Sequence, residues 1–321
     1  MKESVAKIDR VDKTILSMLI QDSRASLSAI AKKARVSKPT IHYRISALEK
    51  EKIILDYVAF IDMRRLGYSL YFILLETDME HQEAIVKVIQ TNPFVFAVIG
   101  LASPQNLMIA TFARDTIHIH ELLGSWSLQK GVRSVSLLPV AVMEFIPYVI
   151  FGASKKSVKE RTVIAKVDGE DIKLLKALSM DSRQPLTTIA PKIGLSAEAL
   201  AKRLNRLKEE RIILSLFTNI NIYRLSFQPY FVLVKLHRKE LLSKIFSLVK
   251  NHASTNGQYI LDNDYSIATV IVVPSILELR TFREQVLAID SLAQIESHLI
   301  TDQYYSNCFP EGVYQNVLKK Y

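Results

Sequence analysis

The sequence predicts an α+β protein in which one module of roughly 150 residues is written twice. Residues 8–75 align without gaps on residues 167–234, and 24 of the 68 aligned positions are identical, far more than chance gives. Within each copy, the periodicity of helices comes first, and segments that read alternately as strands and helices follow. The excess of positive charge lies in the helical parts and in the segment between the copies.

Bulk composition bounds the class of protein. At 321 residues, with 49% hydrophobic and 23% charged residues, the chain is long enough and ordinary enough for several globular cores. One cysteine, Cys308, excludes an internal disulfide framework and favours a reducing cytoplasm. No apolar run is long enough for a membrane span, and the start "MKESVAKIDR" lacks the apolar core of a signal peptide. We therefore expect a soluble, cytoplasmic protein without a membrane partner.

Residues 1–60 predict a winged helix-turn-helix. Asp9, Ser26 and Ser37 are the expected N-caps of three short helices, and Pro39 is tolerated in the first turn of the third. The buried stripe of the first helix follows helical spacing: Val11, Ile15, Met18 and Leu19. The strand pattern "IILDYVAFID" comes next and is expected to form the wing. The repeat predicts a second such domain at 167–219.

The rest of each module predicts a βαββαβ unit, which is the ferredoxin-like arrangement. In the first copy the strands and helices alternate over residues 61–149: "YSLYFILLET", "HQEAIVKVIQTNP", "FVFAVIG", "NLMIATFA", "TIHIHELLGSW" and "VRSVSLLPVAVMEF". The same order recurs over residues 220–302. Residues 150–166 read as a basic linker between the modules, and residues 303–321 read as a C-terminal tail of aromatic and polar residues.

The location of the charge points to a polyanionic partner. The net charge is +10, and residues 1–56 hold 12 basic and 7 acidic side chains. The linker 150–166 holds five basic side chains and one acidic side chain. A positive field concentrated in this way favours nucleic acid, although solubility alone is the plainer explanation.

The pattern of both modules resembles the Lrp/AsnC family of transcriptional regulators. The matching side chains of the first copy span the whole helix-turn-helix: Asp9, Asp12, Leu16, Asp22, Arg24, Ile30, Ala31, Val36, Ser37, Arg44, Leu48, Glu49, Ile53 and Ile54. The resemblance implies that the helical part binds double-stranded DNA. It also implies that the ferredoxin-like part mediates self-association and senses a small molecule such as an amino acid.

A recognition helix is expected after Ser37, with its first residues at base edges in the major groove. The expected DNA contacts of this helix are Ser37, Lys38, Thr40, His42, Tyr43 and Arg44. Nearby basic side chains are expected to meet phosphates: Lys32, Lys33, Arg35 and Lys50. A solvated helix face without a ligand is the alternative.

The second copy departs from this pattern. Its third helix begins "SAEALAKR", in which Glu198 would face phosphates and alanines replace the polar side chains. Lys202, Arg203 and Arg206 remain as expected phosphate contacts. The second helix-turn-helix is therefore expected to bind DNA weakly or to serve as a scaffold.

The turn inside the first helix-turn-helix has an unusual residue. Arg35 stands where the second copy has Gly194, at a turn that often needs a positive φ angle. Such a conformation costs an arginine about 1 kcal/mol. Either the charge is retained for a purpose, or the turn differs between the copies.

The effector site is the least defined expectation. By resemblance, the loop between the second and third strands of each ferredoxin-like unit would hold the effector, with Gly100 and Asn106 in one copy and Asp262 and Asp264 in the other. A plain hairpin loop is the alternative. His118 and His120 lie at i and i+2 on different helix faces, so we expect no metal site, no cofactor and no catalytic residues.

Three functions follow from these expectations. The first is a sequence-specific DNA-binding regulator, not an enzyme, whose two modules pair as a pseudo-dimer within one chain, with a further homodimer open. The second is an enzyme of haem biosynthesis, because sirohaem decarboxylases resemble the same two-part module. The third is a regulator that acts mainly by contact with the transcription machinery.

Overall fold

The computed structural model describes residues 6–144 and 163–320. The first module contains α1 (Arg10–Gln21), α2 (Leu27–Ala34), α3 (Lys38–Lys50), β1 (Ile54–Ile61), η1 (Met63–Leu66), β2 (Ser69–Thr77), α4 (Met79–Gln90), β3 (Val95–Ala102), β4 (Leu107–Ala113), α5 (Thr116–Ser127) and β5 (Val132–Glu144). The predicted α+β class is confirmed. Of the expected linker 150–166, residues 150–162 lie outside the described residues.

The second module repeats this order. It contains α6 (Gly169–Met180), α7 (Leu186–Ile193), α8 (Ala197–Glu209), β6 (Ile213–Ile220), η2 (Tyr223–Leu225), β7 (Gln228–Lys235), η3 (Lys239–Leu241), α9 (Leu242–Asn251), β8 (Thr255–Leu261), β9 (Ile267–Val273), α10 (Ile276–Leu287), β10 (Gln294–Ser306) and α11 (Glu311–Leu318). Pro191 lies inside α7, yet the helix has the same length as α2. An internal proline often kinks or shortens a helix, but Pro191 does not shorten α7.

The helix caps follow the sequence. Asp9 accepts hydrogen bonds from the backbone N–H groups of Val11 and Asp12, and the Asp12 carboxylate accepts one from the Asp9 N–H, which completes a capping box. Ser37 caps α3, with Pro39 in its first turn. These side chains satisfy backbone donors that have no partner within the helix, so α1 and α3 begin where the sequence predicts.

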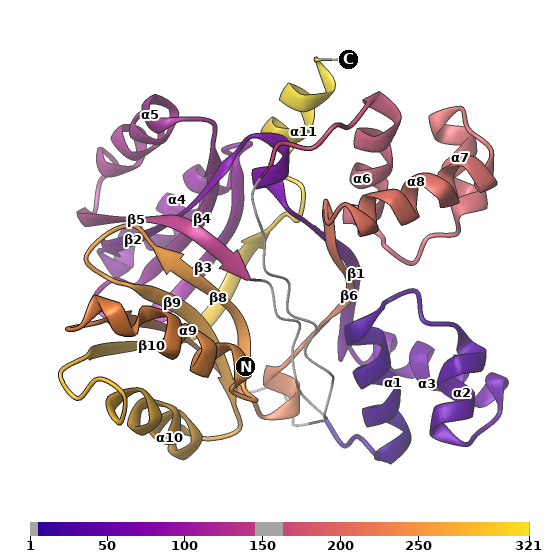
Figure 1. The fold of residues 1–321 in the computed structure, drawn as a ribbon, viewed down its shortest axis with the longest axis horizontal. Helices are drawn as coiled ribbons and strands as arrows, with labels where there is room; N and C mark the ends of the chain where they lie inside the picture. Colours follow the sequence, from indigo (N-terminus) through magenta and orange to yellow (C-terminus); the bar gives the residue numbers. More distant parts are fainter. Residues whose placement is uncertain (1–5, 145–162, 321) are drawn as a thin grey trace.

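The strand after each helix-turn-helix pairs with its counterpart from the other module. β1 and β6 form a two-stranded antiparallel sheet, and they do not fold back as a hairpin beside their own helices. In Figure 1 the two helix-turn-helix units lie on either side of this ribbon, both on the same side of the barrel. α1 packs against β6, whereas α6 packs against β1. The first helix of each module thus packs on the ribbon strand of the other module.

The two ferredoxin-like sheets close into one eight-stranded barrel. Its order is β10-β3-β4-β2-β5-β8-β9-β7. Each module contributes four strands, and the joints are β5 with β8 and β10 with β3, both antiparallel. Closure leaves neither sheet with an unpaired edge. This is the intramolecular pairing of sheets that the sequence predicts.

Alternation along the strands divides the core. In β2, Phe72 faces the barrel interior, while Tyr71 and Ile73 face the helices α4 and α5. In β7, Phe231 faces the interior in the same way, and the Phe72 and Phe231 rings meet edge to face with centroids 5.6 Å apart. Apolar side chains from both modules thus fill the barrel where the sheets meet.

The C-terminal tail has a defined position. β10 runs on to Ser306 beside β3, and α11 then packs against α6. Lys176 on α6 forms an ion pair with Glu311 at 2.8 Å and lies over the Tyr314 ring. The tail therefore joins the second helix-turn-helix to the barrel. Among the described residues, no helix has the length and apolarity that crossing a membrane requires.

Candidate nucleic-acid interface

The recognition helix of the first module presents a basic and aromatic face. Ile41, Ile45 and Leu48 are buried against the other helices, which turns the intervening residues outward. Lys38, His42 and Tyr43 are exposed, and Tyr43 has 72% of its surface accessible. The predicted reading face is therefore available at the surface.

The basic side chains around this face carry uncompensated charge. Within the described parts of the chain, none of them forms an ion pair: Lys32, Lys33, Arg35, Lys38 and Lys50. All five are exposed. Unpaired cations on one side of a helix-turn-helix raise the local potential and favour a polyanion.

Arg44 lies in a different environment from the other expected contacts. Its guanidinium pairs with Asp9 at 2.9 Å and Asp12 at 3.2 Å, and the Asp12 carboxylate raises the pKa of the arginine. Burial in turn raises the pKa of Asp12. Arg44 thus ties α3 to the start of α1. Ser37 and Thr40 share a hydrogen bond of 2.8 Å at the N-terminus of α3.

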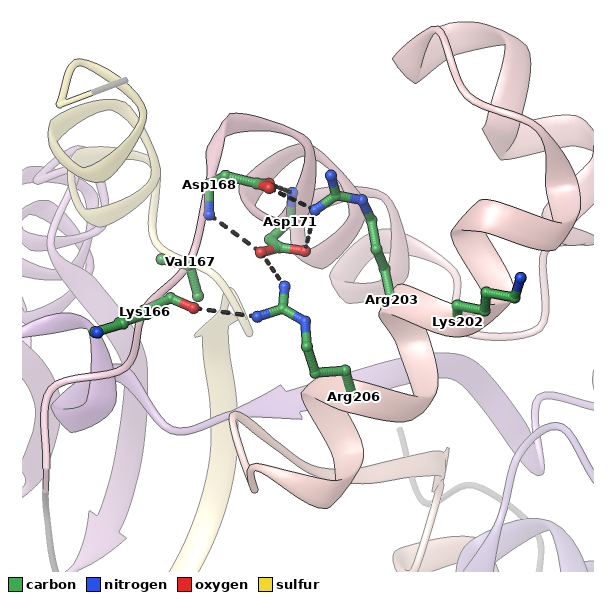
Figure 2. Close-up of a pocket in the computed structure, with 7 residues that line it drawn as sticks. All are labelled: Lys166, Val167, Asp168, Asp171, Lys202, Arg203 and Arg206. Atoms are coloured by element: carbon green, nitrogen blue, oxygen red, sulfur yellow. Dashed lines mark hydrogen bonds and ion pairs between the residues drawn. The ribbon is translucent and has the colours of Figure 1, made fainter.

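The basic residues of the second module are compensated. Lys202 pairs with Glu198 one turn earlier at 2.9 Å. Arg203 pairs with Asp168 at 2.6 Å and with Asp171 at 2.9 Å, which repeats the Arg44 arrangement. Arg206, which aligns with Ala47, adds a further bond to Asp171 (Figure 2). The charge expected to meet phosphates is thus neutralised within the protein.

A hollow of about 440 Å³ opens beside this cluster. It is lined by Lys166, Val167, Asp168, Asp171, Lys202, Arg203 and Arg206. In Figure 2 the two arginines point toward the two aspartates, whereas Lys202 points away from them. Hydrogen bonds from Arg203 raise the pKa of that arginine, with Asp168 as the main partner. The geometry is that of an internal ion-pair cluster.

The expected effector residues lie at two hairpins, β3–β4 in the first module and β8–β9 in the second. Asn106 is buried and binds Thr77, accepting from the Thr77 N–H at 3.0 Å and donating to its carbonyl at 2.8 Å. Asp262 and Asp264 are exposed in the β8–β9 loop, and Asp264 pairs with Lys235 at 3.4 Å. Gly100 on β3 faces the side chains of Thr301 and Tyr304 on β10.

A symmetric contact between the modules was missed from the sequence. The Ser23 and Ser182 hydroxyls lie 2.6 Å apart and buried, and these residues are equivalent in the repeat. Arg24 donates to the Ser182 carbonyl at 2.7 Å, and Arg183 donates to the Ser23 carbonyl at 2.9 Å. The signal was available, because "DSR" is identical at 22–24 and 181–183. The turn holds the two helix-turn-helix units together.

No cluster of three metal-binding side chains occurs in the part of the chain that the structure describes.

Comparisons with known proteins agree with the helical part of each module. The AsnC-type helix-turn-helix domain matches residues 8–49 and 167–208. The chain is 30% identical to the HTH-type transcriptional regulator LrpA of Pyrococcus horikoshii over 37% of this chain and 84% of that protein. It is 32% identical to an HTH-type transcriptional regulator of Pyrococcus furiosus over 40% of this chain and 88% of that protein.

One solved structure is similar over almost the whole chain. The sirohaem decarboxylase NirDL has a TM-score of 0.65 at 13% sequence identity and covers 97% of this chain and 98% of its own. At this identity the likeness shows a shared fold. It overturns the prediction that the chain is not an enzyme, because an enzyme has the same two-module architecture.

Proposed function

This chain belongs to the Lrp/AsnC family of regulators, and on that premise we propose that it is a cytoplasmic, sequence-specific DNA-binding regulator of transcription whose first module reads the DNA. The proposal assigns the reading face to Lys38, His42 and Tyr43, and the phosphate contacts to the basic side chains around them. Arg44 serves to position α3.

The observation that supports the proposal most is the contrast between two equivalent surfaces. Repeat positions that carry Lys32, Arg35 and Lys38 in the first copy carry Pro191, Gly194 and Ala197 in the second. The same backbone therefore presents a positive face in one copy and a nearly neutral face in the other. Packing alone gives no reason for the difference, because all three basic residues are exposed.

Two unequal helix-turn-helix units (here called heads), held at a set spacing within one chain, favour an asymmetric operator. Family members with two equal heads suit two-fold symmetric half-sites. Here the two heads are joined by the β1–β6 ribbon and by the symmetric serine contact, so their spacing is built into one chain. We expect one strongly specified half-site and a second that is contacted weakly. A homodimer of the whole chain would bring two first modules together on a longer site.

The decisive test uses a lysine that both copies share. Lys33 and Lys192 occupy the same position in α2 and α7, and both are exposed. Lys33→Ala should weaken DNA binding several-fold and reduce the slope of log affinity against log salt by about one, because one phosphate contact is lost. Lys192→Ala should change neither. Fluorescence anisotropy on promoter DNA at several salt concentrations measures both.

Two results would contradict parts of this proposal. If the unmodified protein shows no binding at low salt, it is not a DNA-binding regulator of this kind. Equal losses in Lys33→Ala and Lys192→Ala would instead remove the unequal roles of the modules while leaving DNA binding intact.

Control by a small molecule is a separate part of the proposal. An amino acid needs an anionic partner for its ammonium group and donors for its carboxylate. Asp262 in the β8–β9 loop is exposed and forms no ion pair among the described residues, so this loop is the place to test. A thermal-shift screen of the amino acids, repeated with Asp262→Asn, should show a shift that the variant loses.

An enzyme of tetrapyrrole chemistry is the second candidate, and the whole-chain likeness to the sirohaem decarboxylase favours it. Adding sirohaem under anaerobic conditions tests it. A shift of the sirohaem absorption spectrum on adding the protein, together with release of carbon dioxide, would establish the activity. A spectrum identical to that of free sirohaem would exclude binding.

A further inference from the structure

The turn between α2 and α3 contains a backbone conformation that arginine disfavours. Arg35 has φ 59° and ψ 44°, in the left-handed region, and its N–H donates to the Ala31 carbonyl to close the helix. The next residue, Val36, donates to the same carbonyl at 3.2 Å. Glycine reaches this region without steric cost, but a side chain with a Cβ does not.

The second module provides an internal reference for this position. Gly194 takes φ 84° and ψ 27° at the end of α7, and its N–H donates to the Ala190 carbonyl. Leu195 donates to the same carbonyl at 3.1 Å. The two turns therefore have the same hydrogen-bonding pattern, and only their residue differs. Both copies have the left-handed turn, whereas only the first copy has an arginine at that position.

Nothing within the described protein accounts for that arginine. Arg35 is exposed, and its guanidinium makes no hydrogen bond or ion pair within residues 6–144 and 163–320. Its nearest basic neighbours in sequence are Lys32, Lys33 and Lys38, so its charge adds to repulsion on this face. Both the backbone and the local field oppose Arg35 in the free protein.

We propose that Arg35 is a DNA-phosphate contact, kept in a strained backbone conformation because the left-handed turn aims its guanidinium at the duplex beside the N-terminus of α3. The inference rests on the proposed function of the first module. A guanidinium suits the role because its planar fork binds phosphate oxygens through two parallel hydrogen bonds. The positive end of the α3 dipole favours an anion at the same place.

The proposal predicts opposite effects on stability and on binding. Arg35→Gly and Arg35→Asn both relieve the backbone, since glycine and asparagine tolerate this region. We expect an unfolding temperature that is unchanged or higher by a few degrees. We also expect several-fold weaker binding to a random-sequence duplex, with the salt slope reduced by about one. Arg35→Lys should keep part of the affinity.

Two matched variants control for charge and strain. Lys52 follows α3 at its other end with φ 56°, so Lys52→Gly removes one charge and one strained residue away from the reading face. It should leave the salt slope unchanged. At Gly194 a Cβ would meet no atom within 4 Å, so Gly194→Arg adds backbone strain without a clash. It should lower the unfolding temperature by a few degrees.

The outcomes separate this inference from the proposed function. If the unmodified protein binds no duplex, the proposed function fails and this inference fails with it. If the protein binds DNA but Arg35→Gly retains the full affinity and salt slope, only the role of Arg35 is overturned. A fall in unfolding temperature for Arg35→Gly would also overturn it, because Arg35 would then stabilise the fold.

Discussion

At the scale of the residue, two aligned arginines that look like DNA contacts instead bind the protein's own aspartates. Arg44 and Arg203 align in the repeat and look like members of the basic face, yet each pairs with the two aspartates that begin its module. The aspartates cap α1 and α6, and the arginines lie on α3 and α8. Each arginine thus fixes the angle of a recognition helix against the first helix of its own unit.

This arrangement predicts a stability effect for Arg44→Ala. The change removes the cation from Asp12, which is buried, although the carboxylate keeps its bond from the Asp9 N–H. We expect a loss of about 1 kcal/mol in the free energy of unfolding, measured by urea denaturation. Arg203→Ala should cost less, because Arg206 still binds Asp171.

The double variant Arg203→Ala with Arg206→Ala completes the comparison. It leaves the buried Asp171 without a cation, although this carboxylate also keeps its bond from the Asp168 N–H, and we expect a loss of about 1–3 kcal/mol. If each single change and the double change lower the free energy of unfolding by only a few tenths of a kcal/mol, the cluster has no structural role.

At the scale of the element, the ribbon of β1 and β6 connects the heads asymmetrically. Tyr57 on β1 donates from its hydroxyl to Glu49 of α3 at 2.5 Å, and the Arg183 guanidinium lies 5.1 Å from its ring centroid. Burial and this hydrogen bond raise the pKa of Tyr57. The equivalent residue in β6 is Leu216, which cannot make the bond. The first recognition helix therefore has a link to the other module that the second lacks.

The link can be dissected at Tyr57. Tyr57→Phe removes the hydrogen bond to Glu49 and should lower the free energy of unfolding by about 1 kcal/mol. Tyr57→Leu copies the second module and also removes the cation–π contact, so it should cost about 0.5–1 kcal/mol more. The two variants are compared by urea denaturation. Identical losses would show that Arg183 gains nothing from the ring.

At the scale of the whole molecule, the two modules share one core. The barrel closes only when strands of both are present, and Phe72 and Phe231 meet in its interior. The serine contact at Ser23 and Ser182 joins the helical units in the same way. The chain is thus a pseudo-dimer whose association does not depend on concentration.

Phe231→Ala tests this shared core. The side chain is fully buried, so its loss should lower the free energy of unfolding by about 3–5 kcal/mol. Because both sheets line the same interior, the helical and barrel signals should still unfold in one transition. Leu128→Ala, at a residue that is 85% exposed, should change stability by less than about 0.5 kcal/mol. A barrel transition that separates from the helical one would contradict the shared core.

The elements and the repeat were predictable because their signals are local. Caps such as Asp9 and Ser37, the buried stripe of α3 and the apolar run of β2 depend on near neighbours in the chain. The left-handed turn at Arg35 was also visible, because its repeat partner is Gly194. The ion pairs of Arg44, Arg203 and Arg206 could not be predicted, because sequence gives the type of a charged side chain but not its partner.

The sequence by itself determined two unequal copies of one module and placed the unequal charge on the reading face. Only the tertiary structure decided which charges remain free. It paired Arg44, Arg203 and Arg206 with aspartates and left Lys32, Lys33 and Lys38 without ion pairs among the described residues. It also decided that β1 pairs with β6 and that two sheets close one barrel. Ion pairs and strand pairings join residues far apart in the chain, so the folded backbone selects them and local pattern does not.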